Sequence, residues 1–280
     1  MSIIIIGYGQ VGRFVHQMIE SKKLGSIDQI VKSRKESVPK DTCSKILIDC
    51  TASRTISENY EAWIQSGNTI ITANKFPILK LPYEKFSEYC LQNNRSLLFN
   101  ATVCTNIPIF ALIDSYKTTG ESISGIKATV STTLGYISRQ LLDGCDFEKS
   151  VKKATELGYV EPDFRRDLSG EDVLTKAMII SRYLGFDIKK SDILVEPFSK
   201  RDCDKKLANN LKYGLSIIDH RTVKVGWVEA DNWYGVDVHL RSGQKASFAA
   251  NGGGPENAAR ALIQDLYLVL EERLKYRHEI

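Results

Sequence analysis

The sequence predicts an α/β fold in which a doubly wound parallel sheet is followed by a mixed α+β region. Over about the first 105 residues, short β-branched apolar runs alternate with amphipathic segments, which is the pattern of parallel βαβ units. Strand-like and helical stretches then follow without that alternation. The last periodic stretch, 257–276, predicts a long helix. We expect it to return to the first domain, because chain termini often lie close together.

The elements of the first region follow from the spacing of apolar residues. The run SIIIIG at 2–7 predicts a short buried strand that ends in glycine. Val11, Phe14 and Met18 then recur at the spacing of one helix face. Further strands are expected at 26–34, 45–53, 68–75 and 96–103, and helices at 56–67 and 83–94.

The second region combines both kinds of element. Segments 125–138 and 223–243 are rich in β-branched residues and predict strands. Segments 146–159 and 171–186 have the apolar spacing of helices. We therefore expect a dinucleotide-binding domain at 1–105, completed by 252–280, and a second domain at 106–251.

Composition excludes several classes of function. The net charge is +4 with both signs interspersed, which argues against a nucleic-acid-binding face. No apolar run approaches the roughly 20 residues that span a bilayer, and the start lacks the features of a signal peptide. The six cysteines form no CxxC pair and the four histidines are scattered, so we expect neither a metal site nor a disulfide framework. We expect a cytoplasmic protein that binds no membrane.

The segment GYGQVG at 7–12 matches the GxGxxG pattern between a predicted strand and a predicted helix. In that pattern the first glycine makes the tight turn, the second admits a pyrophosphate and the third lets helix and strand pack closely. The pyrophosphate then binds at the helix N-terminus. The alternative is that the glycines serve the turn alone. The residues predicted to bind a dinucleotide are Gly7, Gly9, Gln10, Val11 and Gly12.

The end of the second predicted strand bears on which dinucleotide is bound. An NAD site usually carries an acid there, but the sequence has none before Glu36. Arg34 and Lys35 instead suit a 2′-phosphate. NADP(H) is therefore the preferred cofactor and NAD(H) the alternative. A further alternative is that Arg34 and Lys35 lie in a solvated basic turn that binds no cofactor.

A charged stretch, EPDFRRDLSGEDVLTK at 161–176, combines five carboxylates with three basic residues. Such a composition is typical of a solvated loop, and also of a pocket for a small zwitterion. Asp172 and Lys176 have i, i+4 spacing, so they face the same side of a predicted helix. Pro162 and Gly170 would fix the path of the loop.

Motifs that follow one another along the chain point to a family. They are GYGQVG, IDCTAS, TANK, NATV, STTLGYI, LGYVEPDFRRDLSGEDVLTKAMIISR and GGGPENAARALIQDL. In this order they resemble homoserine dehydrogenase across essentially the whole chain, and the stretch at 158–182 is the most specific. The resemblance is to a short form, without an aspartokinase half or a C-terminal regulatory domain.

The resemblance implies a reaction: L-aspartate 4-semialdehyde is reduced to L-homoserine by a hydride from NAD(P)H, in the biosynthesis of threonine and methionine. It also implies a homodimer in which the second domain provides the substrate pocket and the dimer contact. Lys75 and Lys176 are implied at the active site, and the sequence does not say which of them moves the proton. For either lysine the alternative is an ordinary surface position.

Further site residues are implied by the same resemblance. Tyr159, Glu161, Asp167 and Asp172 would contact the substrate, since an α-ammonium group requires carboxylate partners. The cofactor would be contacted by Thr51, Ser53, Asn74, Gly254 and Glu256. Ser53 is also typical of a helix N-cap, and Gly252–Gly254 of a linker.

Three positions depart from the family pattern. Asn100 and Cys104–Asn106 replace an acid and a glycine-rich stretch, which puts a monovalent cation site in doubt. Thr132 replaces a glycine and Phe164 a proline. Two alternatives therefore remain: an NADP-binding paralogue with little or no turnover, acting as a sensor or scaffold, and an oxidoreductase for a related amino acid aldehyde.

Overall fold

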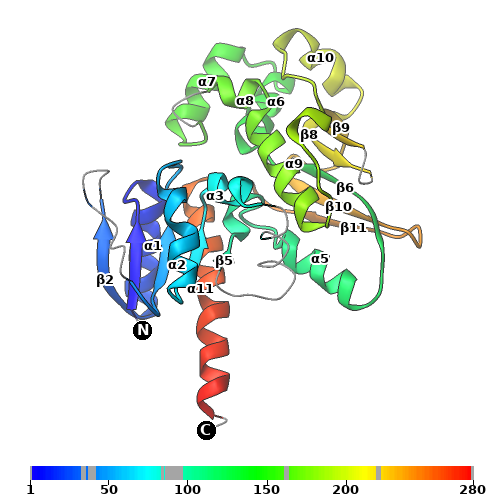
Figure 1. Cartoon of the computed structure of the whole chain (residues 1–280). Coiled ribbons are helices and arrows are strands. Elements are labelled where there is room, and N and C mark those ends of the chain that lie inside the picture. Colours follow the sequence, from blue (N-terminus) through cyan, green and yellow to red (C-terminus); the bar gives the residue numbers. More distant parts are fainter. Residues whose placement is uncertain are drawn as a thin grey trace. The chain divides into compact units, whose positions relative to one another are not determined.

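The computed structural model describes residues 2–32, 36, 42–82, 85, 97–160, 164–218 and 222–278, and only the backbone of 272–278. The chain divides into two compact units (Figure 1). Unit 1 contains Met1–Thr105 and Pro255–Ile280, and unit 2 contains Asn106–Gly254. Unit 1 is therefore built from both ends of the sequence.

The sheet of unit 1 is parallel throughout its described residues. Its strands are β1 (Ser2–Ile6), β2 (Ser26–Val31), β3 (Ile46–Asp49), β4 (Thr69–Thr72) and β5 (Leu97–Leu98). They run in the order β2-β1-β3-β4-β5, with every pair parallel. This arrangement confirms the predicted fold class. The direction of winding reverses between β1 and β3, where ligands bind in open α/β sheets.

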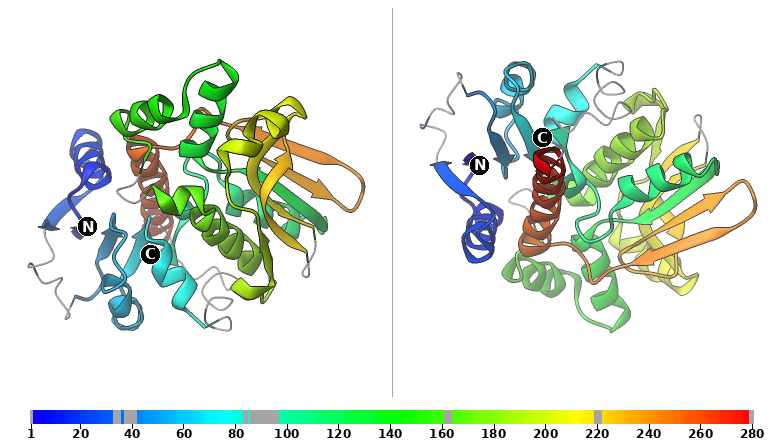
Figure 2. Two further views of the ribbon diagram at one scale, coloured as in Figure 1. Left: turned by 90° about the horizontal axis from the view of Figure 1, so that it is seen from above. Right: turned by 90° about the horizontal axis from the view of Figure 1, so that it is seen from below.

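Helices cover both faces of this sheet. Alternate residues of β1 and β3, such as Ile5 and Ile48, are buried in one apolar cluster with Val15 of α1 (Gln10–Lys22) and Leu262 and Leu266 of α11 (Pro255–His278). Figure 2 shows α11 end-on in its right-hand view. The returning C-terminal helix therefore completes the core of unit 1, as predicted.

The opposite face of the unit 1 sheet carries the helices between β3 and β4. These are η1 (Ile56–Asn59) and α2 (Tyr60–Gln65). Tyr60 of α2 bonds to Asp49, which alternates with Ile48 and so points away from the α1–α11 layer. The short helices α3 (Lys75–Lys80) and η2 (Asn100–Thr102) follow β4 and β5.

Unit 2 contains a mixed sheet whose described strands run in the order β11-β10-β6-β8-β9-β7. The strands are β6 (Ile123–Thr129), β7 (Ile193–Val195), β8 (Leu211–Ile217), β9 (Val223–Glu229), β10 (Gly235–Leu240) and β11 (Lys245–Ala249). The β7–β9 pair is parallel and the other pairs are antiparallel. This is the predicted second, α+β part.

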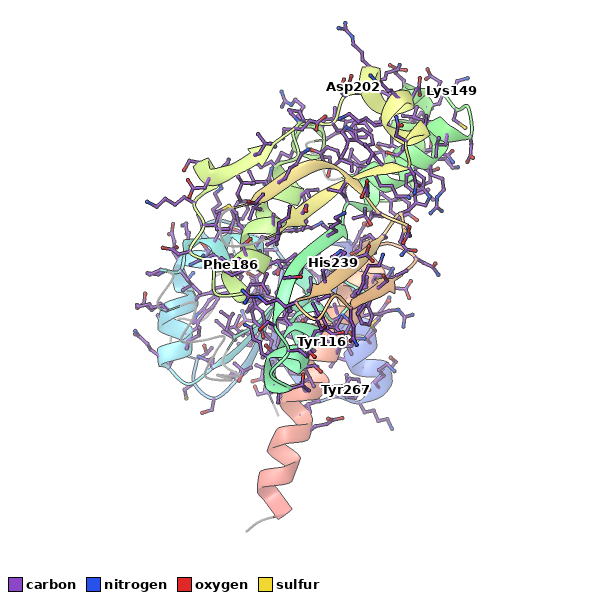
Figure 3. The ribbon with its side chains drawn as sticks, turned by 90° about the vertical axis from the view of Figure 1, so that its right-hand side faces the viewer. Tyr116, Lys149, Phe186, Asp202, His239 and Tyr267 are labelled. Carbon is purple, nitrogen blue, oxygen red and sulfur yellow. The ribbon has the colours of Figure 1, made fainter. Side chains whose placement is uncertain are left out.

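The described helices of unit 2 are α5 (Ile109–Thr118), α6 (Thr132–Leu142), α7 (Phe147–Glu156), α8 (Arg165–Leu168), α9 (Glu171–Tyr183), η3 (Lys190–Asp192) and α10 (Lys200–Ala208). Of these, α6, α9 and α10 pack on the central strand β8, and α7 and α8 pack on other helices. Figure 3 places Lys149 of α7 and Asp202 of α10 at one end of the unit, His239 in the sheet and Tyr116 of α5 at the other end. Among the described residues, none of the helices is long and apolar enough to cross a membrane.

Two sequence predictions about elements are wrong. The strand expected over 125–138 ends at Thr129, and α6 begins at Thr132, because the Ser131 hydroxyl accepts a hydrogen bond of 3.1 Å from the Leu134 amide and caps that helix. The strand expected over 96–103 stops at Leu98 and turns into η2. The helix expected over 83–94 lies almost wholly outside the described residues.

Candidate active site

The turn after β1 requires glycine at two of its three glycine positions. Gly7 has a φ of +91°, and a Cβ there would lie 2.6 Å from Cγ2 of Thr51. A Cβ on Gly12 would overlap the carbonyl oxygen of Gly7. The Gly7 amide also donates to the Val31 carbonyl at 3.0 Å, which fixes the turn against β2. Packing within the protein therefore accounts for both glycines.

Gly9 has a different environment from its neighbours. It is the N-cap residue of α1, and a Cβ built there meets no atom within 4 Å. No described side chain or backbone atom requires glycine at this position. The open space beside Gly9 can therefore accommodate part of a bound ligand. The first amides of α1, at Gln10, Val11 and Gly12, point to the same end of the helix without intrahelical acceptors.

The end of β2 carries charges of both signs. Arg34 and Lys35 lie outside the described residues. The Lys32 ammonium lies 5.3 Å and the Arg13 guanidinium 6.0 Å from the centre of the Tyr8 ring. The Glu36 carboxylate accepts a hydrogen bond of 2.7 Å from the Lys32 amide. An acid therefore does lie at this strand end, although it comes later in the sequence than the usual position.

Asp49, at the end of β3, organises the loop that faces the glycine turn. Its side chain is fully buried, and its Oδ1 accepts from the Thr51 amide at 2.8 Å. Its Oδ2 accepts from the Tyr60 hydroxyl at 2.8 Å and from the Asn74 side-chain amide at 3.1 Å. Burial raises the pKa of Asp49 above its usual value. The sequence prediction missed Asp49, although an acid that ends the apolar run ILID is itself a signal.

Asn74 connects this loop to Lys75. Its side-chain amide donates to the Ser53 carbonyl at 2.9 Å, and its Oδ1 accepts from the Phe76 amide at 3.2 Å, which caps α3. Asn74 is 1% exposed, so its polar atoms hold the protein together and little of it faces solvent. Lys75 begins α3 directly after it. Ser53 Oγ accepts from the Ile56 amide at 3.4 Å, although the N-cap residue of η1 is Thr55 and not Ser53.

In unit 2, Lys176 and Asp172 form the pair that their spacing predicts. The Lys176 ammonium lies 2.7 Å from the Asp172 carboxylate, and their side chains are 12% and 20% exposed. The same ammonium donates to the Val130 carbonyl at 2.6 Å. An i, i+4 pair this well covered differs from a solvated surface pair. The contact with Val130 places the ammonium at the junction of β6 and α6.

The path of the preceding segment depends on Gly170. Its φ is +77°, and a Cβ there would collide with the Tyr213 hydroxyl, which donates to the Glu196 carbonyl at 2.7 Å. Asp167 of α8 is buried, while Glu161 lies outside the described residues. Arg166 and Glu171 form a half-exposed pair at 3.3 Å, in line with solvated charge.

Tyr159 lies at the same junction as Lys176. Its carbonyl accepts a hydrogen bond of 2.6 Å from the Thr133 hydroxyl, next to Val130. Its ring lies 3.7 Å from the position that a Cβ of Gly254 would take. A cavity of about 560 Å³ is lined by Tyr159 together with Thr132 and Gly252. Unit 2 therefore brings the second lysine, an acid and a tyrosine to one junction.

Two further positions concern α11. Glu256 is exposed and pairs with Arg260 at 2.7 Å. Asp265 is fully buried and accepts hydrogen bonds from the backbone and side-chain amides of Asn100. Burial raises the pKa of Asp265 to about 7. The two amide groups of Asn100 thus occupy both carboxyl oxygens of Asp265.

Comparison with known proteins gives the family. The family model described as homoserine dehydrogenase matches residues 108–267, more than half of the chain. The chain belongs to the homoserine dehydrogenase family. The matched region contains the whole stretch from Tyr159 to Lys176 that carries most of the candidate substrate residues.

Relatives and solved structures agree with this assignment. The bifunctional aspartokinase/homoserine dehydrogenase of Buchnera aphidicola is 29% identical over 171 residues, which cover 60% of this chain and 20% of that protein. The chain thus spans about a fifth of the length of that relative. The crystal structure of homoserine dehydrogenase from Thermoplasma acidophilum is 21% identical, covers 97% of this chain and 99% of its own, and superposes with a TM-score of 0.79.

A second solved structure, a hyperthermophilic archaeal homoserine dehydrogenase in complex with NADPH, is 19% identical. It covers 98% of both chains and has a TM-score of 0.75. At these identities the likeness shows that the homoserine dehydrogenase fold is shared along nearly the full length of the chain.

Proposed function

We propose that this protein is an NADP(H)-dependent oxidoreductase that interconverts L-aspartate 4-semialdehyde and L-homoserine. The observation that carries the proposal is the covered Lys176–Asp172 pair, held by the Val130 carbonyl. It lies within the segment that matches the homoserine dehydrogenase family. The family membership supports the reaction class, and the side chains support the acid–base chemistry.

The residues of unit 1 fit a dinucleotide. Gly9 leaves open space beside the first amides of α1, where a pyrophosphate can accept hydrogen bonds. Thr51 lies in contact distance of the glycine turn, on the other side of the point where the winding of the sheet reverses. Gly7, Gly12, Gln10 and Val11 complete this proposed site. The cations proposed to bind a 2′-phosphate are Arg34 and Lys35, with Lys32 and Arg13 close to the end of the same strand.

A nicotinamide bound there supplies the hydride for the carbonyl carbon. The carbonyl oxygen becomes negatively charged as the hydride arrives, so it must receive a proton. The Lys176 ammonium can donate that proton, and the Asp172 carboxylate holds it in place. In the reverse direction the neutral amine takes the proton of the substrate hydroxyl. Lys75, at the end of a parallel strand of unit 1, is the second candidate for this step.

The same segment supplies partners for an amino acid. The α-ammonium group of the substrate requires carboxylates, and the proposed ones are Glu161, Asp167 and Asp172. Asp167 is buried, which reduces screening of its charge by water. Tyr159 lies at the same junction and can contact the substrate. Asn74, Ser53, Gly254 and Glu256 are proposed on the cofactor side. The hydrogen bonds of Asn74 with Ser53 and Phe76 support a role for Asn74 through the loop that it holds together.

The direct test mixes the purified protein with NADP⁺ and L-homoserine at alkaline pH and follows the absorbance of NADPH. Turnover with L-homoserine supports the proposal. Tight NADPH binding in calorimetry without any turnover would support a binding protein instead. That second candidate is favoured by the side chains of Asn106 and Thr132, which occupy positions where the family has small residues. Turnover only with an analogue would indicate a related aldehyde substrate.

We further propose a homodimer, as family membership suggests, and a cytoplasmic location. Cys43 and Cys145 are free and exposed, which suits a reducing compartment. Light scattering on the purified protein tests the first point: a mass near twice 31.5 kDa is expected, and the mass of one chain would contradict it.

A further inference from the structure

The loop between β11 and α11 is held by two side chains from earlier parts of the chain, Asn106 in a turn and Thr132 at the start of α6. This loop, Gly252–Gly254, is called the glycine loop below. The Asn106 side-chain amide donates a hydrogen bond of 2.8 Å to the Gly252 carbonyl. The Gly253 amide donates one of 2.7 Å to the Thr132 hydroxyl. The peptide group between Gly252 and Gly253 is therefore bound at both its carbonyl and its amide, within unit 2.

Without these contacts the glycine loop would be highly mobile. Gly252 has a φ of +91° and Gly254 of +102°, values that L side chains rarely adopt, so both positions need glycine. Glycine has the largest conformational freedom of any residue, and ordering it costs the most entropy. Two fixed hydrogen bonds offset part of that cost.

We propose that Asn106 and Thr132 are positioning residues that hold the glycine loop in one conformation before any ligand binds. Each side chain supplies one hydrogen bond to the loop, so together they fix one wall of the site. The wall they fix is the one next to Tyr159, because a Cβ built on Gly254 would lie 3.7 Å from the Tyr159 ring. The loop also borders the cavity that Thr132 and Tyr159 line.

The two contacts decide which backbone groups remain for a ligand. They occupy the Gly252 carbonyl and the Gly253 amide. The Gly254 amide, within the described part of the chain, has no hydrogen-bond partner. It is thus the amide of the loop that can donate to an anionic or carbonyl group of a bound molecule. A loop held in this way presents that donor in a fixed direction, which lowers the entropic cost of binding.

The test uses variants that differ by few atoms. Thr132→Val removes the acceptor and keeps the shape, Thr132→Ser restores the acceptor, and Asn106→Ala removes the donor. Matched controls are Thr155→Val and Asn209→Ala, because both side chains are exposed and make only local hydrogen bonds. Thr155 donates to the Val151 carbonyl within α7, and Asn209 donates to the Lys205 carbonyl at the end of α10. These controls lie outside the proposed site.

Glycine labelled with ¹³C at the carbonyl and with ¹⁵N makes the loop visible by NMR. Gly253 and Gly254 are the two glycines that follow a glycine in the sequence, so a carbonyl-correlated amide spectrum contains signals from these two residues. Thr132→Val is expected to speed hydrogen exchange of the Gly253 amide about threefold to tenfold, the worth of one hydrogen bond. Thr132→Ser and both controls should leave the exchange rate of the Gly253 amide as in the parent. Asn106→Ala should broaden or shift the amide signals of Gly253 and Gly254. An unchanged Gly253 amide in Thr132→Val and Asn106→Ala would overturn the proposal.

A kinetic measurement addresses the consequence for catalysis, which rests on the proposed function. Thr132→Val is expected to raise KM for NADPH about threefold to tenfold with kcat nearly unchanged, and Thr132→Ser to restore it. Equal losses of kcat in Thr132→Val and Thr132→Ser would contradict a positioning role. If the parent protein shows no turnover, the proposed function fails, and the NMR result still decides whether the two side chains hold the loop.

Discussion

The Tyr60 hydroxyl donates a hydrogen bond of 2.8 Å to the Asp49 carboxylate, and both side chains are buried. The same carboxylate accepts from Asn74, the residue before Lys75. A contact between α2 and the end of β3 therefore helps to set where the first candidate lysine begins its helix. Tyr60 touches neither proposed ligand, so it acts through the loops that Asp49 holds.

Tyr60→Phe should destabilise the protein without changing its fold. The change leaves a buried carboxylate and the Thr72 hydroxyl, 2.7 Å from the Tyr60 oxygen, each without one partner. The expected loss in the free energy of unfolding is about 1–3 kcal/mol, measured by urea denaturation. Tyr267→Phe, at an exposed position of α11, is the matched control and should cost nothing measurable. Equal stability of Tyr60→Phe and the parent would contradict this role.

Gly7→Ala and Gly9→Ala should separate folding from binding. Alanine at Gly7 meets Thr51 and an unfavourable φ, so the free energy of unfolding should fall by at least about 1–2 kcal/mol. Alanine at Gly9 meets no atom of the protein, so stability should stay within about 0.5 kcal/mol of the parent. Gly9→Ala should nevertheless raise Kd for NADPH by about tenfold, or 1.4 kcal/mol, in calorimetry. Unchanged NADPH affinity in Gly9→Ala would place the pyrophosphate elsewhere.

Lys176→Ala and Lys75→Ala should each abolish turnover while NADP(H) still binds. Loss of a proton donor typically lowers the rate by about 10²–10⁴. Asp172→Asn should lower kcat less than Lys176→Ala does, because the ammonium keeps the Val130 carbonyl. Lys153→Ala, an exposed lysine of α7, is the control and should retain full activity. Near-normal kcat in either lysine variant would remove that lysine from the mechanism.

The choice of cofactor should depend on the end of β2. Arg34→Ala is expected to weaken NADPH far more than NADH, because only NADPH carries the 2′-phosphate. Glu36→Gln should have the opposite effect on NADPH, since its carboxylate lies next to the Lys32 amide and repels a phosphate there. Calorimetry with both cofactors measures the ratio of affinities. Equal losses for NADPH and NADH in Arg34→Ala would refute the 2′-phosphate assignment.

Asp265 should make stability depend on pH. In the folded protein its carboxyl keeps a proton up to about pH 7, whereas an unperturbed aspartate loses it near 3.8. Between these values the folded state binds more protons than the unfolded state, so stability falls as pH rises. The contribution amounts to roughly 4 kcal/mol across that window.

Asp265→Asn removes that dependence, because an amide does not titrate. Urea denaturation at pH 5 and pH 8 measures the free energy of unfolding. Relative to the parent, the variant should be more stable at pH 8 than at pH 5. The Asn100 amide can turn to present its oxygen, which has no partner among the described residues. Asp143→Asn, at an exposed position, should show no such gain. A parent and variant that differ equally at both pH values would contradict the raised pKa.

Much of unit 1 could be predicted from local sequence, because its causes are local. The isoleucine run, the glycine turn and the apolar spacing of α1 act within about twenty residues of one another. The i, i+4 pair of Asp172 and Lys176 is equally local and formed as expected. The strand predicted over 125–138 was wrong beyond Thr129, because a single cap at Ser131 outweighed the β-branched residues that follow it.

The parts that sequence reasoning missed depend on contacts between distant residues. The sequence shows Asn106 and Thr132 only as departures from the family pattern, because their partner, the glycine loop, lies more than a hundred residues further along the chain. The sequence also gives no sign that the Asn74 side-chain amide donates to Asp49 and Ser53, since these partners lie more than twenty residues earlier in the chain. Glu36 was passed over because it comes late in the strand-end segment, yet its carboxylate returns to Lys32.

The place of α11 in unit 1 also has a consequence for how the chain matures on the ribosome. Ile5 and Ile48 emerge early, but Leu262 and Leu266, which cover them, emerge about 200 residues or more later. At synthesis rates of roughly 5–20 residues per second, one face of the parallel sheet stays uncovered for about 10–50 s, until α11 has been synthesised. The residues of unit 2 are synthesised during that interval, so its sheet can form before the last element of unit 1 is available.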